Sequence, residues 1–323
     1  MPAYTVFGNE LSYFSRKLEA AMRLYELDFS LQPKSPERTQ EIETRAGTHQ
    51  VPVLLTPENW MIADTTPLLQ LLDARVPRRT MFPSGASGLL IHLVEEYFDE
   101  WVARTMVHYR WHYEESAVFA SLRIAAGNAD AAARVRAWGP RACRATGTDS
   151  THQQRMAEDE YQRLLDAMER QLRTTRYLMG DRPTAVDCVV LGGLRAHTWM
   201  DPTPKRVVAA YPAVVDWVEH RADAWDGLGD LPAFPETTDF GHLVLADMRE
   251  HYLPFALANR DALNVGAKAC QVETYSEIVS YLTRPYPERS RQMLVNRLQG
   301  LPDDEQARGQ DWLKTVGLLP LLT

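Results

Sequence analysis

The chain has 323 residues, of which 45% are hydrophobic and 24% charged, enough to bury the core of two ordinary domains. Its 35 basic and 43 acidic residues give a net charge of −8, which argues against a general nucleic-acid-binding protein and favours a soluble one. No apolar stretch approaches the roughly 20 residues that span a bilayer, and residues 1–4 lack the basic and apolar parts of a secretion signal. We therefore expect a cytoplasmic protein.

The first predicted elements are a strand at residues 4–7 and a helix at 17–25, whose apolar residues recur at helical spacing. Ser12 therefore lies in a strand-to-helix turn. A helix N-terminus offers unpaired N–H groups and a partial positive charge, so a thiolate bound there, with the Ser12 hydroxyl donating, would be stabilised. The alternative is that Ser12 is an ordinary helix N-cap.

A second strand is predicted at residues 50–55, entered through the Val51-Pro52 bond. If that bond is cis, the main chain of Val51 can pair in antiparallel fashion with an extended peptide. The alternative is an edge strand that begins with proline. Next, Asp64 and Thr65 precede a helix with proline in its first turn. Its N-terminal donors and the Thr65 hydroxyl can hold a carboxylate, and Asp64 can meet an ammonium group.

Taken in this order, the three segments closely resemble the amino-terminal domain of the glutathione transferase superfamily, which has a thioredoxin-like fold. The likeness covers about residues 3–77 and continues more loosely to about residue 225. By this resemblance Ser12 takes the catalytic hydroxyl position, and Tyr13, where many members have proline, is a second candidate. The resemblance also implies glutathione as co-substrate, with no metal. The glutathione-binding residues that it implies are Phe14, Gln50, Val51, Pro52, Asp64 and Thr65.

After a linker, a long helix is predicted from about residue 88 to 126, with apolar, aromatic and basic side chains along one face. In the family the corresponding helix lines the pocket for the electrophilic co-substrate. The candidates for this pocket are Tyr97, Trp101, Arg104, His108, Tyr109 and Trp111. The alternative is that the aromatic residues are helix–helix core. His108 and His112 stand four residues apart but lack a third ligand, so no metal site is predicted.

Beyond residue 126 the sequence predicts a surface insertion or an irregular helix pair at 127–151 and an amphipathic helix at 154–171. Thr184 and Asp187 then form a variant capping box before an apolar run, which resembles the buried N-capping sequence of the family's helical domain. Its expected role is in folding.

The remaining residues, 236–323, form an extension longer than the compact members of the family carry. Here we expect helices near 240–259, 289–298 and 303–316, and a stretch with β-like alternation at 272–281. This tail either packs over the substrate cleft or stabilises the protein as an appendage.

The predicted architecture is thus an α/β thioredoxin-like domain at 1–80, an all-helical domain at 86–225 and a mostly helical extension at 236–323. The first hypothesis is a glutathione transferase, with a role in detoxification, that activates the thiolate for attack on a small hydrophobic or aromatic electrophile. Conjugation, dehalogenation and isomerisation share this step. The second hypothesis is a non-catalytic scaffold with the same fold. The family likeness also implies a homodimer, although the tail can block that surface.

Overall fold

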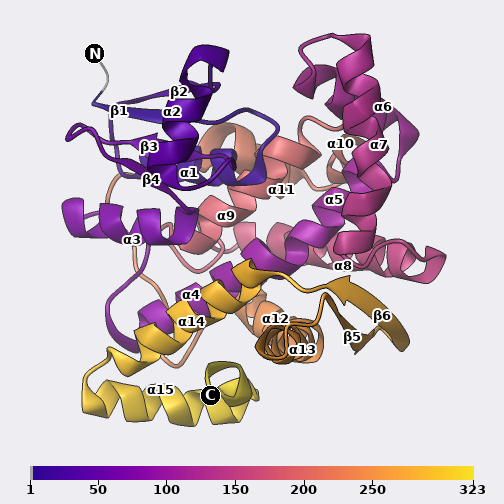
Figure 1. The fold of residues 1–323 in the computed structure, drawn as a ribbon. Coiled ribbons are helices and arrows are strands. Elements are labelled where there is room, and N and C mark those ends of the chain that lie inside the picture. The colour runs from indigo at the N-terminus through magenta and orange to yellow at the C-terminus, as the bar shows by residue number, and fades with distance from the viewer. Residues whose placement is uncertain (1–2) are drawn as a thin grey trace.

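The computed structural model describes residues 3–323, so Met1 and Pro2, where the first domain was predicted to begin, lie outside the described part. The first domain combines four strands with three helices (Figure 1). The strands are β1 (Tyr4–Phe7), β2 (Phe29–Gln32), β3 (Val53–Leu55) and β4 (Met61–Ala63). The helices are α1 (Tyr13–Leu24), α2 (Pro36–Ala46) and α3 (Thr65–Arg75). This mixed α/β arrangement confirms the predicted thioredoxin-like domain.

The strands form one mixed sheet in the order β2-β1-β3-β4. β1 runs parallel to β2 and antiparallel to β3, which is antiparallel to β4. In this register Phe7 pairs with Val53, and Val53 pairs with Ala63. The end of β1, the start of β3 and the end of β4 therefore lie side by side at one end of the sheet.

A helical domain follows, as predicted, but the long helix expected at 88–126 is interrupted. It consists of α4 (Gly85–Glu96), a π-helical turn η1 (Tyr97–Val102), α5 (Ala103–Trp111) and α6 (Glu114–Ile124). The segment expected as a surface insertion or an irregular helix pair is largely the single helix α7 (Ala129–Ala145). The other elements of this domain are α8 (Thr151–Leu172), α9 (Ala185–Gly193), η2 (Leu194–Thr198), α10 (Pro202–Val208), α11 (Pro212–Asp216) and η3 (Trp217–Arg221).

The two domains pack through α1 and α9, at a point where Gly192 permits a close approach. A Cβ atom on Gly192 would lie 2.7 Å from the Tyr13 carbonyl oxygen and 2.9 Å from the Lys17 amide nitrogen. Since real Cβ atoms do not come this close to backbone atoms, a larger residue would push the helices apart. The core continues from this contact into both domains.

The C-terminal tail confirms the predicted mostly helical extension, with one β-hairpin. Its elements are α12 (Asp239–Asp247), η4 (Met248–Tyr252), α13 (Leu253–Asn264), β5 (Ala269–Thr274), β6 (Glu277–Leu282), α14 (Pro285–Gln299), α15 (Asp303–Val316) and η5 (Leu319–Leu322). Figure 1 shows α14 lying along α4, with α15 beside it at the bottom of the view. The tail therefore packs against the helical domain through α12, η4, β6, α14 and α15.

Two further observations concern the described part of the chain only. None of its helices is long and apolar enough to cross a membrane. Nor does it bring together three or more His, Cys, Asp or Glu side chains that could hold a metal ion.

Candidate functional site

The candidate site lies at the end of the sheet where β1, β3 and β4 meet. The loop after β1 carries Ser12, the bend before β3 carries Val51 and Pro52, and the residue after β4 is Asp64. Because Phe7, Val53 and Ala63 are directly paired, the strand register brings these three segments together. The Val51 and Asp64 segments, some 40 and 50 residues after Ser12 in the sequence, thus lie at the same end of the sheet as the Ser12 loop.

Ser12 is the N-cap of α1, and its side chain also has an unused donor. Its Oγ accepts a hydrogen bond from the Ser15 N–H at 3.2 Å. A hydroxyl that accepts one bond can still donate its own hydrogen, and no acceptor for it occurs within the described residues. The hydroxyl is half-buried at the positive end of a 12-residue helix. It is therefore equipped to donate to an anion.

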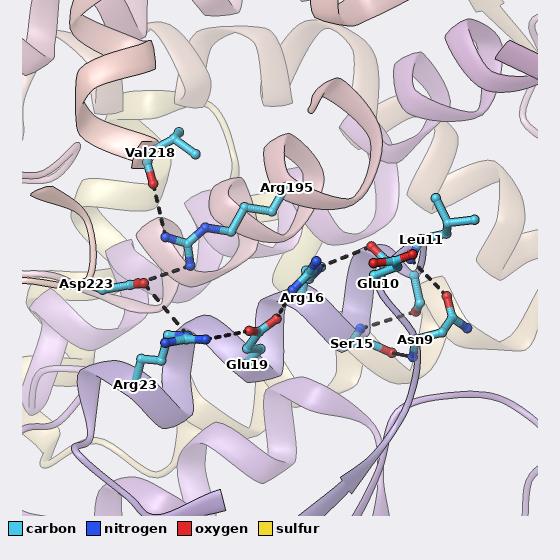
Figure 2. A network of polar contacts seen from close by, with 11 residues as sticks. Asn9, Glu10, Leu11, Ser15, Arg16, Glu19, Arg23, Arg195, Val218 and Asp223 are labelled. Atoms are coloured by element: carbon cyan, nitrogen blue, oxygen red, sulfur yellow. Dashed lines mark hydrogen bonds and ion pairs between the residues drawn. The ribbon is translucent and has the colours of Figure 1, made fainter. Parts of the chain in front are cut away.

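The turn around Ser12 is held by hydrogen bonds from both sides. The Asn9 N–H donates to Ser15 Oγ at 3.3 Å, and the Leu11 N–H donates to Asn9 Oδ1 at 3.0 Å. Arg16 Nε donates to the Glu10 carbonyl at 3.2 Å. These bonds fix the backbone that presents the Ser12 hydroxyl (Figure 2).

Arg110 of α5 fastens the same turn to the helical domain. Its buried guanidinium donates to the Leu11 carbonyl at 2.7 Å, to the Ala196 carbonyl at 2.8 Å and to Asp201 Oδ2 at 2.8 Å. Burial lowers the pKa of Arg110, whereas the Asp201 carboxylate acts in the opposite direction. Sequence reasoning missed Arg110, since its partners are far away in the chain.

The polar network of Figure 2 continues along α1 away from this turn. Glu19 pairs with both Arg16 and Arg23, and Asp223 accepts from Arg195 at 3.1 Å. Arg23 and Asp223 lie 3.8 Å apart. These contacts link α1 to the end of the helical domain. Basic and acidic side chains alternate along this part of the contact between the two domains.

The second catalytic candidate, Tyr13, points into the interior. Its side chain is buried, and its hydroxyl donates to the Phe98 carbonyl at 3.2 Å. Burial, and then the carboxylates of Asp99 and Glu95, raise its pKa well above the ordinary value. This placement disfavours Tyr13 as a donor to a bound thiolate and leaves Ser12.

The other predicted glutathione-binding residues at this end of the sheet differ in exposure. The Val51-Pro52 bond is cis, which meets the condition set from the sequence. Val51 and Phe14 are half-buried, Pro52 is buried and Gln50 is exposed. The Gln50 N–H donates to Thr48 Oγ1 at 3.1 Å.

Asp64 takes a backbone conformation that is rare for a side-chain-bearing residue. Its φ is 74°, directly before the first turn of α3. Such strained residues concentrate at functional sites. Although Asp64 is exposed, desolvation by the surrounding protein and then the neighbouring Asp99 raise the pKa of its carboxyl, against the influence of Lys17. Thr65 is buried at the helix start.

Behind Asp64 lies a buried ionic cluster that the sequence analysis did not single out. Lys17 Nζ pairs with Glu95, lies 2.8 Å from Asp99 Oδ1 and donates to Thr66 Oγ1 at 3.1 Å. Burial lowers the pKa of Lys17, but the carboxylates of Asp99 and Glu95 outweigh burial and the net shift is upward. Lys17 lies four residues before Ala21, on the apolar face of its helix. A lysine in this position was the sequence signal that could have indicated a buried ion pair.

The predicted co-substrate residues are corrected by the structure, because five of them belong to the packed core. These buried residues are Tyr97, Trp101, Arg104, His108 and Tyr109. The first three all donate to the buried Glu160 carboxylate, at 2.9, 2.9 and 2.7 Å. His108 Nε2 lies 2.8 Å from Glu158. The alternative interpretation as helix–helix core therefore applies here.

A second row of side chains on the same helical segment is less deeply buried. Glu100, Ala103, Val107 and Trp111 are half-buried and recur at helical spacing. Trp111 packs edge-to-face on Trp138 of α7, with ring centroids 5.9 Å apart. On the same helix, Arg110 donates to the Leu11 carbonyl, next to Ser12 in the sequence. Of the predicted pocket residues, only Trp111 belongs to this second row.

Comparison with protein families gives two matches that follow one another along the chain. Residues 6–80 match the model "Glutathione S-transferase, N-terminal domain", and residues 139–223 match "Glutathione S-transferase, C-terminal domain". The chain thus belongs to the glutathione S-transferase superfamily. Among curated proteins, the comparison found no match.

The solved structures that this chain matches are distant from it in sequence. The β-etherase LigF from Sphingobium sp. strain SYK-6 is 12% identical, with a TM-score of 0.51, over 70% of this chain and 96% of that one. A glutathione S-transferase from Rhodospirillum rubrum F11 is 16% identical, with a TM-score of 0.46, over 67% and 86%. One from Methylobacterium radiotolerans, in complex with glutathione sulfonate, is 18% identical, with a TM-score of 0.44, over 69% and 92%.

Proposed function

We propose that this protein is a cytoplasmic glutathione transferase-like enzyme that activates the glutathione thiolate for attack on a small hydrophobic or aromatic electrophile. The proposal is supported by the pairing of Phe7, Val53 and Ala63, because Ser12, Val51 and Asp64 lie in the segments that adjoin these three residues. Ser12, Val51 and Asp64 provide a donor for a thiolate, main-chain groups for the cysteinyl part and a carboxylate for the γ-glutamyl ammonium group.

In this mechanism the Ser12 hydroxyl and the N-terminus of α1 act on the thiol sulfur. Both favour the thiolate over the thiol, which lowers the thiol pKa and supplies the nucleophile near neutral pH. The thiolate then attacks an electrophilic atom of the co-substrate. If a halide is displaced, it takes the bonding electrons with it; in conjugation to an activated double bond, a proton completes the addition. Ala103, Val107 and Trp111 are the proposed wall for this co-substrate.

The test is isothermal titration of the protein with glutathione and with S-methylglutathione at pH 7. Saturable binding of both is expected. Asp64→Ala should weaken it about tenfold, as the loss of one charge-assisted contact does. Absence of binding to either compound would refute the proposal and leave the scaffold hypothesis.

The role of Ser12 is tested separately by following thiolate absorbance of bound glutathione against pH. Ser12→Ala should raise the pKa of the bound thiol and spare binding. Asn128→Ala is the matched control, because Asn128 caps α7 through the same kind of bond, to the Ala131 N–H at 2.9 Å, and belongs to none of the three segments of the site. An unchanged thiol pKa in Ser12→Ala would show that Ser12 only caps its helix.

A further inference from the structure

The tail helix α14 and helix α3 of the first domain both contact α4. Thr66, in the first turn of α3, donates to Glu95 Oε1 at 2.7 Å. Ser290 of α14 donates to Glu96, the next residue of α4. Because Glu95 and Glu96 are neighbours, the start of α3 and the first half of α14 lie at the same level along α4.

An open groove runs between α3 and α14. It has a volume of about 430 Å³ and is lined by Gln70 of α3 and, from the tail, by Met293, Asn296, Arg297, Gly300 and Leu301. Arg289 lies four residues before Met293, so it continues the groove-lining face of α14. Since its neighbour Ser290 is level with Thr66, Arg289 lies toward the end of the groove at which α3 begins.

Arg289 carries a positive charge that the described part of the chain leaves without a counter-charge. Its guanidinium lies over the ring of Tyr286, 5.5 Å from the centroid, and forms no ion pair or hydrogen bond with the described residues. Arg291, two residues further along, is instead buried and pairs with Glu288 at 2.8 Å. Because Arg289 is exposed, it is free to bind an anion from solvent.

Arg289 also lies within electrostatic range of Asp64. Desolvation and then Asp99 raise the pKa of the Asp64 carboxyl, while Lys17 and Arg289 oppose the rise. Lys17 is fully buried and already paired with Glu95 and Asp99. Of these two cations, Arg289 is therefore the one that can reach a ligand.

Asp64 and Arg289 together suit the two charges of an amino-acid group, which carries an ammonium and a carboxylate on the same carbon atom. Asp64 is the proposed partner of the γ-glutamyl ammonium group. The carboxyl groups of Asp64, Asp99 and Glu100 are close enough to repel one another, so a carboxylate bound beside them needs a positive charge. A guanidinium supplies that charge and can donate two parallel hydrogen bonds.

We propose that Arg289 of the C-terminal tail binds the α-carboxylate of the γ-glutamyl group, so that the tail completes the glutathione site. This inference rests on the proposed function, since it names a further binding residue for the same ligand.

The experiment is isothermal titration of the full chain at pH 7 with glutathione and with γ-aminobutyryl-cysteinylglycine, which lacks only the α-carboxylate. Arg289→Gln should weaken the binding of glutathione about tenfold and leave the binding of the analogue unchanged. Arg170→Gln is the matched control, because it removes the same charge from an exposed position on α8, which does not line the groove. It should leave the binding of both compounds unchanged.

A second analogue, glutaryl-cysteinylglycine, lacks only the ammonium group. Its binding should be weakened by Arg289→Gln as that of glutathione is, and it should be insensitive to Asp64→Ala. The two variants and the two analogues thus assign one charge of the amino-acid group to each side chain.

The outcomes separate this inference from the proposed function. If the unmodified chain does not bind glutathione, both are refuted. If it binds glutathione and Arg289→Gln binds it equally well, the role of Arg289 alone is refuted. An equal loss for glutathione and γ-aminobutyryl-cysteinylglycine would also overturn it, because Arg289 would then act on another part of the ligand or on the packing of the tail.

Discussion

The Ser12 hydroxyl is the N-cap of its helix, and its geometry is compatible with the proposed role as a donor to a thiolate. It caps α1 by accepting from the Ser15 N–H, and it keeps a hydrogen to donate. The two roles are compatible, because an N-cap places a hydroxyl beside the positive end of the helix. Ser12→Ala should therefore cost about 1 kcal/mol of stability, whatever its effect on chemistry.

Glu100 gives a prediction about pH. The pKa of its carboxyl is raised to about 7, mainly by burial. The folded state therefore binds a proton that the unfolded state has lost, and stability falls as pH rises from about 4.5 to 7. Glu100→Gln removes this contribution. We expect the variant to match the unmodified chain at pH 4.5 and to be more stable at pH 8, by about 1 kcal/mol or more.

Urea unfolding of both proteins at the two pH values measures this difference. Glu273→Gln is the control, because Glu273 is exposed on β5 and should leave the pH dependence unchanged. A Glu100→Gln variant whose advantage is the same at pH 4.5 and pH 8 would contradict the raised pKa.

Lys17 gives a second prediction for a single residue. It is fully buried and pairs with Glu95 and Asp99, so its removal leaves two carboxylates without a counter-charge. Lys17→Met should destabilise the protein by about 3–5 kcal/mol, as the breaking of a buried ion pair does. Lys314→Met removes a lysine from the exposed pair with Asp311 and should change stability by less than about 1 kcal/mol. Comparable losses in chemical denaturation would refute this account of the cluster.

Among the elements, the start of α9 shows how far a local motif predicts structure. The expected capping box of Thr184 and Asp187 is present and confirmed. Asp187 accepts from the Thr184 N–H at 2.8 Å and also from the Leu178 N–H at 3.0 Å. The second bond fixes the preceding loop, a role that the four-residue motif alone did not reveal.

We therefore expect Asp187→Ala to lower the stability of the protein more than Thr184→Ala does. The first leaves two buried N–H groups unsatisfied and should cost about 2 kcal/mol or more; the second should cost about 1–2 kcal/mol. Asn128→Ala, at an exposed N-cap, should cost about 1 kcal/mol or less. Denaturant midpoints give the ranking, and an Asp187→Ala variant as stable as Asn128→Ala would contradict it.

The sequence predicted the elements of this protein better than the directions of their side chains. Apolar periodicity located α15 at residues 303–316 and the hairpin region at 272–281. It did not reveal the π-helical turn η1, which changes the facing of every residue after Tyr97. Nor could it show that Trp101 and Arg104 turn inward, since their partner Glu160 is more than 50 residues away.

The candidate site was easier to predict, because it depends on where elements begin and end. Ser12, Val51 and Asp64 lie at the ends of strands or the starts of helices, and such positions follow from local sequence. That these segments meet at one end of the sheet follows from strand pairing, and the family resemblance supplied the sheet topology. Arg110 and Lys17 needed the folded chain, because each is defined by contacts with another domain.

At the scale of the whole molecule, the tail completes the surface of α4. The Glu305 carboxylate accepts from the Ala86 N–H at 2.7 Å, and Arg297 donates to His92 at 3.0 Å. Tyr252 and Ser290 both donate to the buried Glu96. The homodimer implied by family likeness remains a prediction, and any partner must bind a surface that the tail leaves open.

These contacts predict that the chain cannot be shortened to the length of compact family members. A chain ending at Pro235 would expose apolar side chains of α4 and η1 and would leave Glu96 without its two donors, with a carboxyl whose pKa burial already raises. A newly exposed apolar face of this size promotes aggregation. We expect the 1–235 chain to bind a hydrophobic dye and to sediment as aggregates, whereas the full chain sediments as one defined species. A soluble, cooperatively unfolding 1–235 chain would show instead that the tail is an appendage to a complete fold.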